Sequence, residues 1–413
     1  MTAAAGRALL LENIHASAVD VLEAAGFEVD QRPGSLGVDE LASELRGVTL
    51  LGIRSNTKLP AEIFAEAADL AAVGCFCIGT NQVDLGAATA AAVPVFNAPY
   101  SNSRSVVELV IAEILSLARR LTGKNHLMHQ GVWDKSAAGS HEVRGRTLGI
   151  VGYGNIGTQL ANVAESLGMR VYFYDLADRP VHGNARRAAT LGELLAVADV
   201  VSLHVDGRPG NAGLFGADEF AKMKPGAVFI NASRGMVVDD EALRDQLVAG
   251  HLSGAALDVF PIEPKAQGDG FESVLRGLDN VILTPHIAAS TQEAQEEIGW
   301  FVGGKLAKYF HGGDTGLSVN FPHAQLPGPA EGSHRVSFVH HNVPGVLAEL
   351  NTVLGKGGIN VTAQALATVG ELGYVLTELE SAPPPELLST IDALPHAVAT
   401  RLGGAASARS SAR

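Results

Sequence analysis

A glycine-rich turn between a strand and a helix constrains the fold of this chain more than any other feature. The turn reads Gly152-Tyr153-Gly154-Asn155-Ile156-Gly157 and directly follows the apolar run 148–151. An acidic residue, Asp175, ends the next apolar run, 18 positions beyond Gly157. The pattern G-x-G-x-x-G arises by chance in glycine-rich chains, but strand, helix and acid together are the context of a dinucleotide-binding βαβ unit.

The three glycines and the acid of this turn have separate predicted roles. Gly152 permits a tight turn, Gly154 lets the backbone approach a pyrophosphate, and Gly157 lets the helix approach the strand. The N-terminus of the following helix supplies an anion site. Asp175 is expected to accept hydrogen bonds from the adenosine ribose and to repel a 2′-phosphate, which predicts NAD rather than NADP as the cofactor.

Strands and helices alternate over most of the chain, which predicts an α/β fold with a parallel sheet in each of two domains. Expected strands lie at 9–11, 48–53, 73–78, 93–96, 148–151, 170–174, 200–204, 227–231, 254–257 and 281–284. We expect a flavodoxin-like substrate-binding domain, residues 1–101 and 290–319, into which a Rossmann-type domain, residues 102–289, is inserted. The long apolar helix predicted at 102–122 needs cover from its own domain and from a second subunit.

A Pro/Gly-rich linker at 320–333 precedes a third predicted domain, residues 334–403. Its elements follow the order βαββαβ, the split-βαβ or ferredoxin-like plan. The Ser/Ala/Gly/Arg tail 404–413 is expected to be disordered.

The charge balance and the cysteines exclude several functions. The formal net charge of −14 disfavours binding to nucleic acid or to anionic lipid. The longest N-terminal apolar run is too short for a signal or membrane segment, so we expect a cytoplasmic protein. Cys75 and Cys77 alternate within an apolar run and provide neither a disulfide framework nor a metal site.

Three polar residues follow strands of the second predicted sheet, at the edge where such sheets bind ligands. They are Arg234, Glu263 and His286. An imidazole accepts a hydroxyl proton near neutral pH, a carboxylate on its other nitrogen holds the tautomer, and a guanidinium clamps a substrate carboxylate. Each has a plain alternative: a surface cation, a solvated turn and a core histidine. Together, after a nucleotide motif, they favour catalysis.

In these contexts Arg234, Glu263 and His286 resemble the catalytic triad of the D-isomer-specific 2-hydroxyacid dehydrogenases. Within that family, residues 5–403 are similar to the bacterial phosphoglycerate dehydrogenases of the short type, which carry a C-terminal ACT domain. The resemblance is carried by the runs 53–55, 74–84, 96–99, 101–106 and 290–296. It implies NAD-dependent oxidation of 3-phospho-D-glycerate to 3-phosphohydroxypyruvate, the first step of serine synthesis, by a homotetramer.

The resemblance also implies site residues. Those on the substrate side are Arg54, Ser55, Asn102 and Gln295, and Lys135 is a further candidate that a neighbouring subunit could supply. Those on the cofactor side are Thr80, Gly152, Gly154, Asn155, Ile156, Gly157, Asp175, Ala232, Ser233, Arg234, Asp258, His286, Ile287, Ala288 and Ala289. In the ACT domain His340, Asn342 and Asn360 match the positions that bind serine, an expected feedback inhibitor.

The sequence departs from the family pattern at three places. Asn56 stands where a basic residue often helps to hold the substrate phosphate, and Arg32 or Lys135 are candidate replacements for that charge. His204-Val205-Asp206 replaces the usual His-Val-Pro, and Val343 replaces an arginine of the serine site. Two alternatives therefore stay open: a reductase for glyoxylate, hydroxypyruvate or 2-oxoglutarate, and a non-catalytic NADH-sensing corepressor.

Overall fold

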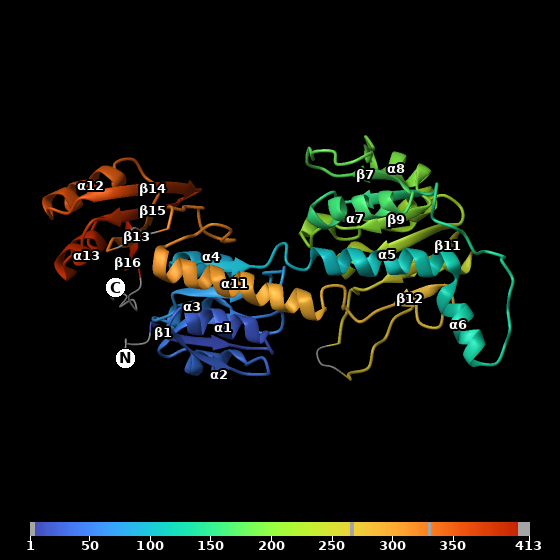
Figure 1. Cartoon of the computed structure of the whole chain (residues 1–413), viewed down its shortest axis with the longest axis horizontal. Coiled ribbons are helices and arrows are strands. Elements are labelled where there is room, and N and C mark those ends of the chain that lie inside the picture. The colour runs from blue at the N-terminus through green and yellow to red at the C-terminus, as the bar shows by residue number, and fades with distance from the viewer. Residues whose placement is uncertain (1–4, 265–267, 329–331, 404–413) are drawn as a thin grey trace. The chain divides into compact units, whose positions relative to one another are not determined.

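The structure, a computed structural model, describes residues 5–264, 268–328 and 332–403. The predicted disordered tail lies outside these residues. The chain divides into two compact units: residues 1–101 with 295–413, and residues 102–294. Figure 1 shows the elements of each unit, and the units are described separately below. The boundaries of the three predicted domains remain a prediction.

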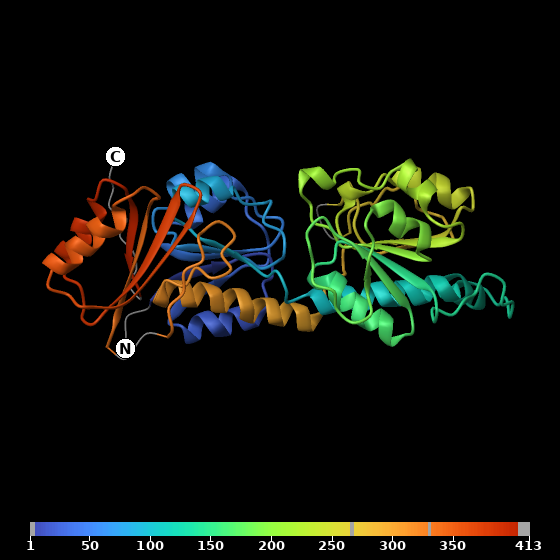
Figure 2. The ribbon, with the colours of Figure 1, turned by 90° about the horizontal axis from the view of Figure 1, so that it is seen from above.

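The first unit contains a parallel sheet with the strand order β2-β1-β3-β4-β5. Its strands are β1 (Gly6–Leu10), β2 (Phe27–Gln31), β3 (Val48–Ile53), β4 (Ala72–Cys75) and β5 (Val95–Asn97). Helices α1 (Ala16–Ala24) and α11 (Gln292–Gly312) cover one face, and α2 (Val38–Glu44), α3 (Ala61–Glu66) and α4 (Leu85–Ala90) cover the other (Figure 2). Apolar residues on both faces explain the continuous apolar strands seen in the sequence.

The second unit contains a seven-stranded sheet with the order β12-β11-β10-β9-β6-β7-β8. Its strands are β6 (Thr147–Val151), β7 (Arg170–Tyr174), β8 (Arg186–Arg187), β9 (Val200–Leu203), β10 (Ala227–Asn231), β11 (Leu252–Leu257) and β12 (Val281–Leu283), all parallel. The chain runs from β6 outward to β7 and then returns to the other side of β6 with β9. This reversal creates a topological switch point at the carboxyl ends of β6 and β9, where ligands of such sheets bind.

Helices cover both faces of this second sheet. The residues of α5 (Ser103–Arg119) and α7 (Asn155–Ser166) share one apolar cluster with the sheet. Those of α8 (Leu191–Val197), α9 (Ala217–Lys222) and α10 (Asp240–Val248) share another. Both faces of the sheet are therefore buried, as the apolar strands predict.

The helix predicted at 102–122 differs from the structure in two ways. It ends at Arg119, because Arg120 adopts φ of 52°, and α6 (Leu121–His129) continues in a new direction. Arg104, Glu108 and Ala112 form an exposed stripe, so α5 is not apolar all round. The sequence gives no warning of the break, since arginine rarely adopts the left-handed conformation.

The C-terminal elements of the first unit form an antiparallel sheet with the order β14-β15-β13-β16. They are β13 (His334–His341), α12 (Val346–Lys356), β14 (Val361–Val369), β15 (Leu372–Leu379), α13 (Pro385–Asp392) and β16 (Ala397–Leu402). Both helices share one apolar cluster with the sheet. This is the expected ferredoxin-like βαββαβ arrangement.

The first part of the predicted linker is firmly packed. Asn320 accepts a hydrogen bond from the backbone N–H of Val95 at 2.8 Å and donates one to the carbonyl of Val93 at 3.0 Å. Phe321 and Ala324 are buried in the apolar cluster that α1 and α11 share with the first sheet. Residues 320–324 are thus a fixed extension of that sheet, and a hinge would have to lie further along the chain.

Candidate active site

The glycine-rich turn joins β6 to α7 at the topological switch point. Gly152 has φ of 94°, and a Cβ atom built on it would lie 2.5 Å from the carbonyl oxygen of His204, at the end of β9. A Cβ atom on Gly157 would lie 2.4 Å from the carbonyl oxygen of Gly152. Gly154 has open space at the same position. The first and third glycines are therefore required by the fold, whereas the second leaves room for a ligand at the start of α7.

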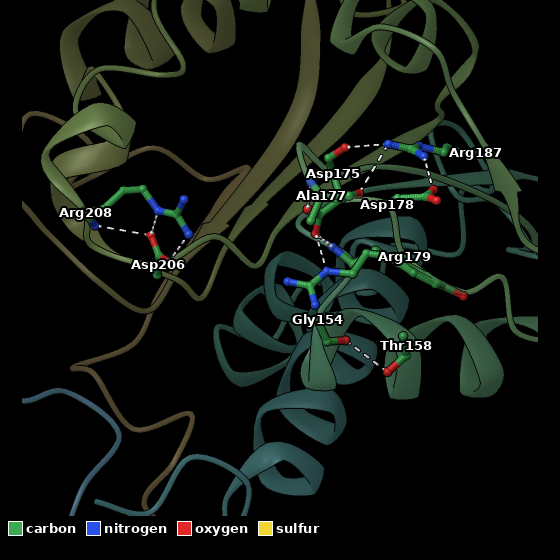
Figure 3. A network of polar contacts seen from close by, with 10 residues as sticks. Gly154, Thr158, Asp175, Ala177, Asp178, Arg179, Arg187, Asp206 and Arg208 are labelled. Atoms are coloured by element: carbon green, nitrogen blue, oxygen red, sulfur yellow. Dashed lines mark hydrogen bonds and ion pairs between the residues drawn. The ribbon is translucent and has the colours of Figure 1, made fainter. Parts of the chain in front are cut away.

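Asp175 follows β7, beside this turn, as the sequence predicts. Its Oδ2 accepts a hydrogen bond from the backbone N–H of Tyr153 at 2.8 Å, and its Oδ1 accepts one from Ala177 at 2.8 Å. Arg179 lies 3.6 Å from the same carboxylate (Figure 3). Asp175 thus ties the glycine-rich turn to the next strand and keeps a carboxylate at the position expected to receive the adenosine ribose.

Figure 3 draws two more arginines: Arg187, which is bonded to the group around Asp175, and Arg208, which forms a separate pair with Asp206. Arg187 donates to the carboxylate of Asp178 at 2.6 Å and to the backbone carbonyl of Asp175 at 3.2 Å. Arg208 donates twice to Asp206, at 2.7 and 2.5 Å, and this hydrogen bonding lowers the pKa of Asp206. Asp206 stands where the family pattern has proline. Its negative charge is compensated by the ion pair with Arg208.

Glu263 and His286 form a hydrogen-bonded pair in the second unit. His286 Nδ1 lies 2.9 Å from Glu263 Oε2, and Glu263 Oε1 accepts a hydrogen bond from the backbone N–H of Phe260 at 3.1 Å. The hydrogen bond from His286 to the Glu263 carboxylate raises the pKa of His286 above its ordinary value, although burial opposes the change. Burial raises the pKa of Glu263, but the contacts with His286, the hydrogen bond from Phe260 and the charge of Arg234 together lower it below its ordinary value.

The loop that carries His286 is held by a buried carboxylate. Asp258 is 1% exposed and accepts hydrogen bonds from Thr284 Oγ1 at 2.7 Å and from the backbone N–H groups of Ile287 and Ala288 at 2.8 Å each. His286 has φ of 54°, a conformation that non-glycine residues seldom adopt. The contacts of Asp258 therefore hold this loop, a role that the sequence analysis, which placed Asp258 on the cofactor side, did not anticipate.

Arg234 follows β10 and belongs to the same electrostatic environment. Its guanidinium donates to the carbonyl of Ser233 at 2.6 Å, and its positive charge acts to lower the pKa of His286. Ser233 is buried and donates through its hydroxyl to Asn231 Oδ1 at 2.7 Å. All three predicted catalytic residues thus lie in the second unit, where Glu263 contacts His286 and the charge of Arg234 acts on His286.

The other predicted cofactor residues of this unit lie at the carboxyl ends of its strands. Asn155 and Ile156 begin α7, Ala232 follows β10, and Ala289 follows the His286 loop. Thr80 belongs to the first unit, where its carbonyl accepts a hydrogen bond from Val83.

The predicted substrate residues are divided between the two units. Arg54, Ser55 and Gln295 belong to the first unit, and Asn102 and Lys135 to the second. Asn102 is 2% exposed, and its Oδ1 has no hydrogen-bond partner among the described residues.

Arg32, one of the two candidate replacements for the missing basic residue at position 56, already forms ion pairs within its own unit. The Arg32 guanidinium lies 2.7 Å from Glu44 and 3.3 Å from Asp30. Its charge is therefore compensated locally, so Arg32 is a poor source of charge for a substrate phosphate. Lys135 is exposed.

The three residues of the predicted serine site do not meet within one chain. His340 is 3% exposed and pairs with Gly373 near the start of β15, and the Asn342 amide donates to the carbonyl of Gly370 at 3.0 Å. Asn360 precedes the pairing of Val361 with Leu379 at the far end of β15. Six residues of an extended strand separate these ends by roughly 20 Å.

Sequence analysis missed one buried acid in the second unit. Glu113 lies on α5 and is 3% exposed, and neither of its carboxyl oxygens has a hydrogen-bond partner among the described residues. Burial, and secondly the charge of Asp258, raise the pKa of Glu113 to about 8. No local signal distinguishes it from Glu108, the exposed glutamate of the same helix.

Within the residues that the structure describes, no group of three or more His, Cys, Asp or Glu side chains could hold a metal ion. No helix in the described part of the chain combines the length and the hydropathy that a membrane span requires.

The geometry fits a nicotinamide dinucleotide, and comparisons with known proteins agree. Residues 111–288 match the family model described as D-isomer specific 2-hydroxyacid dehydrogenase, NAD binding domain. A D-3-phosphoglycerate dehydrogenase of Haemophilus influenzae is 50% identical over 395 residues, which cover 95% of this chain and 96% of that protein. The enzyme of the same name from Escherichia coli K12 is 49% identical over 397 residues, with the same two coverages of 95% and 96%.

A solved structure of D-2-hydroxyisocaproate dehydrogenase has a TM-score of 0.69 at 22% identity. It covers 76% of this chain and 99% of its own, and at this identity the likeness shows the fold alone. High identity over nearly the whole length, together with the match of the NAD-binding domain, establishes that this chain belongs to the family of D-isomer-specific 2-hydroxyacid dehydrogenases.

Proposed function

We propose that this protein oxidises 3-phospho-D-glycerate to 3-phosphohydroxypyruvate with NAD, the first step of serine synthesis. The observation that carries the proposal is the Glu263–His286 pair, at 2.9 Å, in the same unit as an intact dinucleotide motif. Relatives named for this activity are about half identical to the chain over nearly all of its length, which supports the choice of substrate.

His286 is the proposed base. In the oxidation its Nε2 accepts the proton of the C2 hydroxyl, and Glu263 stabilises the imidazolium that results. The contact with Glu263 raises the pKa of His286, which favours the protonated form that this step produces. The bound proton is later released to solvent.

Arg234 is the proposed clamp for the substrate carboxylate, since a guanidinium binds a carboxylate through two parallel hydrogen bonds. NAD supplies the hydride acceptor when bound. Gly154, Asn155 and Ile156 at the start of α7 are proposed to hold its pyrophosphate, and Asp175 its adenosine ribose.

Arg54, Ser55, Asn102, Gln295 and Lys135 are the proposed substrate-side residues. We further propose that Arg54 and Ser55 hold the charged end of the substrate that does not react. Because Asn56 stands where relatives often have a basic residue, Arg54 is the one cation in residues 54–57. A substrate panel is therefore needed to separate 3-phospho-D-glycerate from other 2-hydroxy acids.

We propose that serine inhibits the enzyme through a site made by two C-terminal domains. His340 and Asn342 of one chain, with Asn360 of a second, would supply donors and acceptors for its carboxylate and ammonium. The separation of these residues along β15 supports a site of two chains over a site within one. A coupling of about 1–3 kcal/mol between this site and the active site is enough for feedback inhibition.

A homotetramer is the proposed assembly. Exposed apolar side chains on and after α6 support contacts between second units: Leu121 is 57% exposed and Trp133 74% exposed. The two-chain serine site supplies the second kind of contact. A chain that ends after Pro327 keeps the packed residues 320–324 and should form an active dimer. If the truncated chain stays tetrameric, the C-terminal domain has no role in forming the tetramer.

The test of the proposed function is a panel of substrates with NAD, followed by NADH absorbance, with and without L-serine. The panel contains 3-phospho-D-glycerate, D-lactate, glycolate, D-glycerate and 2-hydroxyglutarate. We expect the highest kcat/KM with 3-phospho-D-glycerate. A preference for an unphosphorylated acid would support the alternative of a different 2-hydroxyacid dehydrogenase, and no turnover of any acid would support a binding protein.

A further inference from the structure

A buried carboxylate in the first unit binds the backbone of the segment that contains Arg54. Glu12 follows β1 and is 7% exposed. Its Oε1 accepts hydrogen bonds from the backbone N–H groups of Arg54 at 3.2 Å and Thr57 at 2.8 Å. Its Oε2 accepts one from the N–H of Asn56 at 3.0 Å. Three N–H groups that converge in this way form a site for an anion, and an internal anion fills it.

The backbone at Glu12 is itself unusual. Glu12 and Asn13 have φ of 65° and 52°, in the left-handed region that residues with a Cβ atom seldom adopt. Hydrogen bonds from these two residues to the carbonyls of Gly34 and Arg32, at 3.1 and 3.4 Å, hold the conformation. A disfavoured backbone that is held by its surroundings is typical of functional sites. Here the residue with this backbone conformation is also the one whose carboxylate binds the segment 54–57.

A second buried side chain holds the same segment from its carbonyl side. Gln82 is 6% exposed, and its amide donates to the carbonyl oxygens of Arg54 at 2.7 Å and Gly79 at 3.3 Å. The N–H of Arg54 is bound by Glu12 and its C=O by Gln82. The main chain of Arg54 is thus fixed on both sides, and the freedom that remains belongs to its side chain.

We propose that Glu12 is a positioning residue for substrate binding, which acts through the segment 54–57 and touches no substrate. Because its carboxylate occupies the N–H groups of Arg54, Asn56 and Thr57, those groups do not bind a substrate anion. The side chains of Arg54 and Ser55 then bind the substrate anion, and Glu12 holds the backbone that carries them. This inference rests on the proposed role of Arg54 and Ser55 in binding the substrate.

The first test compares the kinetics of Glu12→Gln and Glu12→Ala with those of the wild-type enzyme. Glutamine has one acceptor oxygen for three donors, and alanine has none. We expect KM for 3-phospho-D-glycerate to rise about 10- to 100-fold, more for alanine than for glutamine, since a displacement of about 1 Å can cost 10²-fold. The kcat and the KM for NAD should stay within about twofold, because lost binding that is equal in ground and transition states leaves kcat unchanged.

Glu40→Gln is the matched control, because Glu40 is an exposed glutamate of the same unit. It makes the same change of charge and should leave every kinetic constant unchanged. A Glu12→Ala enzyme with wild-type KM would overturn the proposal, and so would a loss confined to kcat.

The second test does not depend on the substrate. Hydrogen exchange of the full-length protein, read by mass spectrometry, reports the backbone N–H groups of residues 54–57. We expect these amides to be protected in the wild type and to exchange faster in Glu12→Gln, with no change in peptides from the second unit. Equal exchange in the two proteins would refute the contact. If no 2-hydroxy acid is turned over, the proposed function fails, while this measurement still decides whether Glu12 holds the segment 54–57.

A third variant covers the possibility that Glu12→Ala does not fold. Gln82→Leu removes the hydrogen bond to the carbonyl of Arg54 and leaves Glu12 in place. It should raise the same KM by a smaller factor, with kcat unchanged. Unchanged KM in both Gln82→Leu and Glu12→Gln would contradict positioning through the backbone of Arg54.

Discussion

His286 Nδ1 lies 2.9 Å from Glu263 Oε2, so one of the two imidazole nitrogens is held by a carboxylate. The contact also joins two segments that lie 23 residues apart in the chain. Its effect on the pKa of His286 is upward, and this direction determines how the rate should depend on pH.

Replacement of His286 by alanine should nearly abolish turnover and leave NADH binding intact. The variant loses the proton acceptor, which contributes about 10²–10⁴-fold to the rate, and keeps the glycine-rich turn and Asp175. Stopped-flow kinetics and NADH fluorescence titration measure the two properties. His141→Ala, at an exposed position of the same unit, is the control. A His286→Ala enzyme with near-normal turnover would refute the assignment.

Replacement of Glu263 by glutamine should move the acidic limb of the kcat/KM profile to lower pH. The oxidation needs neutral His286, whose pKa is raised chiefly by its hydrogen bond to Glu263. Without that carboxylate the pKa falls toward its ordinary value, and the neutral base persists at lower pH, although the maximal rate falls. Glu272→Gln, at a carboxylate 91% exposed, should leave the limb in place. An unmoved limb in Glu263→Gln would mean that another group titrates.

Replacement of Asp175 by asparagine should reduce the preference for NAD over NADP. The change removes the negative charge that faces a 2′-phosphate, and it frees Arg179, which lies 3.6 Å from that carboxylate. The ratio of kcat/KM for the two cofactors measures the effect. In the double variant Asp175→Asn/Arg179→Ala the gain with NADP should be smaller, because only the loss of the negative charge remains. Unchanged discrimination in the single variant would assign the choice to another residue.

Replacement of Glu113 by glutamine should stabilise the protein at neutral pH more than at acidic pH. The native pKa of Glu113 is raised from 4.5 to about 8, chiefly by burial. Between these values the unfolded chain is ionised and the native chain keeps the proton, so the free energy of unfolding falls as pH rises. At roughly 1.4 kcal/mol per pH unit, the advantage of the variant should grow by about 2 to 3 kcal/mol between about pH 5.5 and 7.5.

Urea unfolding at the two pH values measures this change, with ellipticity and NADH binding as separate probes. Glu108→Gln, at an exposed glutamate of the same helix, is the control and should show no such dependence. If Glu113→Gln keeps the pH dependence of the wild type, Glu113 is not the group that titrates.

Mixed oligomers should reveal whether the serine site belongs to two chains. Asn342→Ala and Asn360→Ala enzymes should each lose inhibition by L-serine and keep basal activity. When the two variants are refolded together, half of the sites in each mixed pair combine an intact Asn342 with an intact Asn360. Inhibition should therefore partly return, which a site within one chain does not allow. Wild-type enzyme that ignores millimolar L-serine would leave the C-terminal domain with a role in assembly alone.

Much of the fold and part of the candidate site follow from the sequence, because they depend on local order. The apolar strands, the glycines of the turn at 152–157 and the acid at 175 are fixed by short-range geometry, and so is the βαββαβ order of the C-terminal domain. Arg234, Glu263 and His286 could be selected because each follows a strand and all such ends meet at one edge of a parallel sheet.

Only the tertiary structure decided what depends on residues far apart in the chain. Glu12 binds N–H groups more than 40 residues away, Asp258 holds the loop after Thr284, and Glu113 lies buried without a partner among the described residues. No local pattern marks such a carboxylate, because its role is set by the donors and the burial that the fold brings to it. The break of the helix at Arg120 has the same origin, since its left-handed conformation contradicts the local preference of the residue.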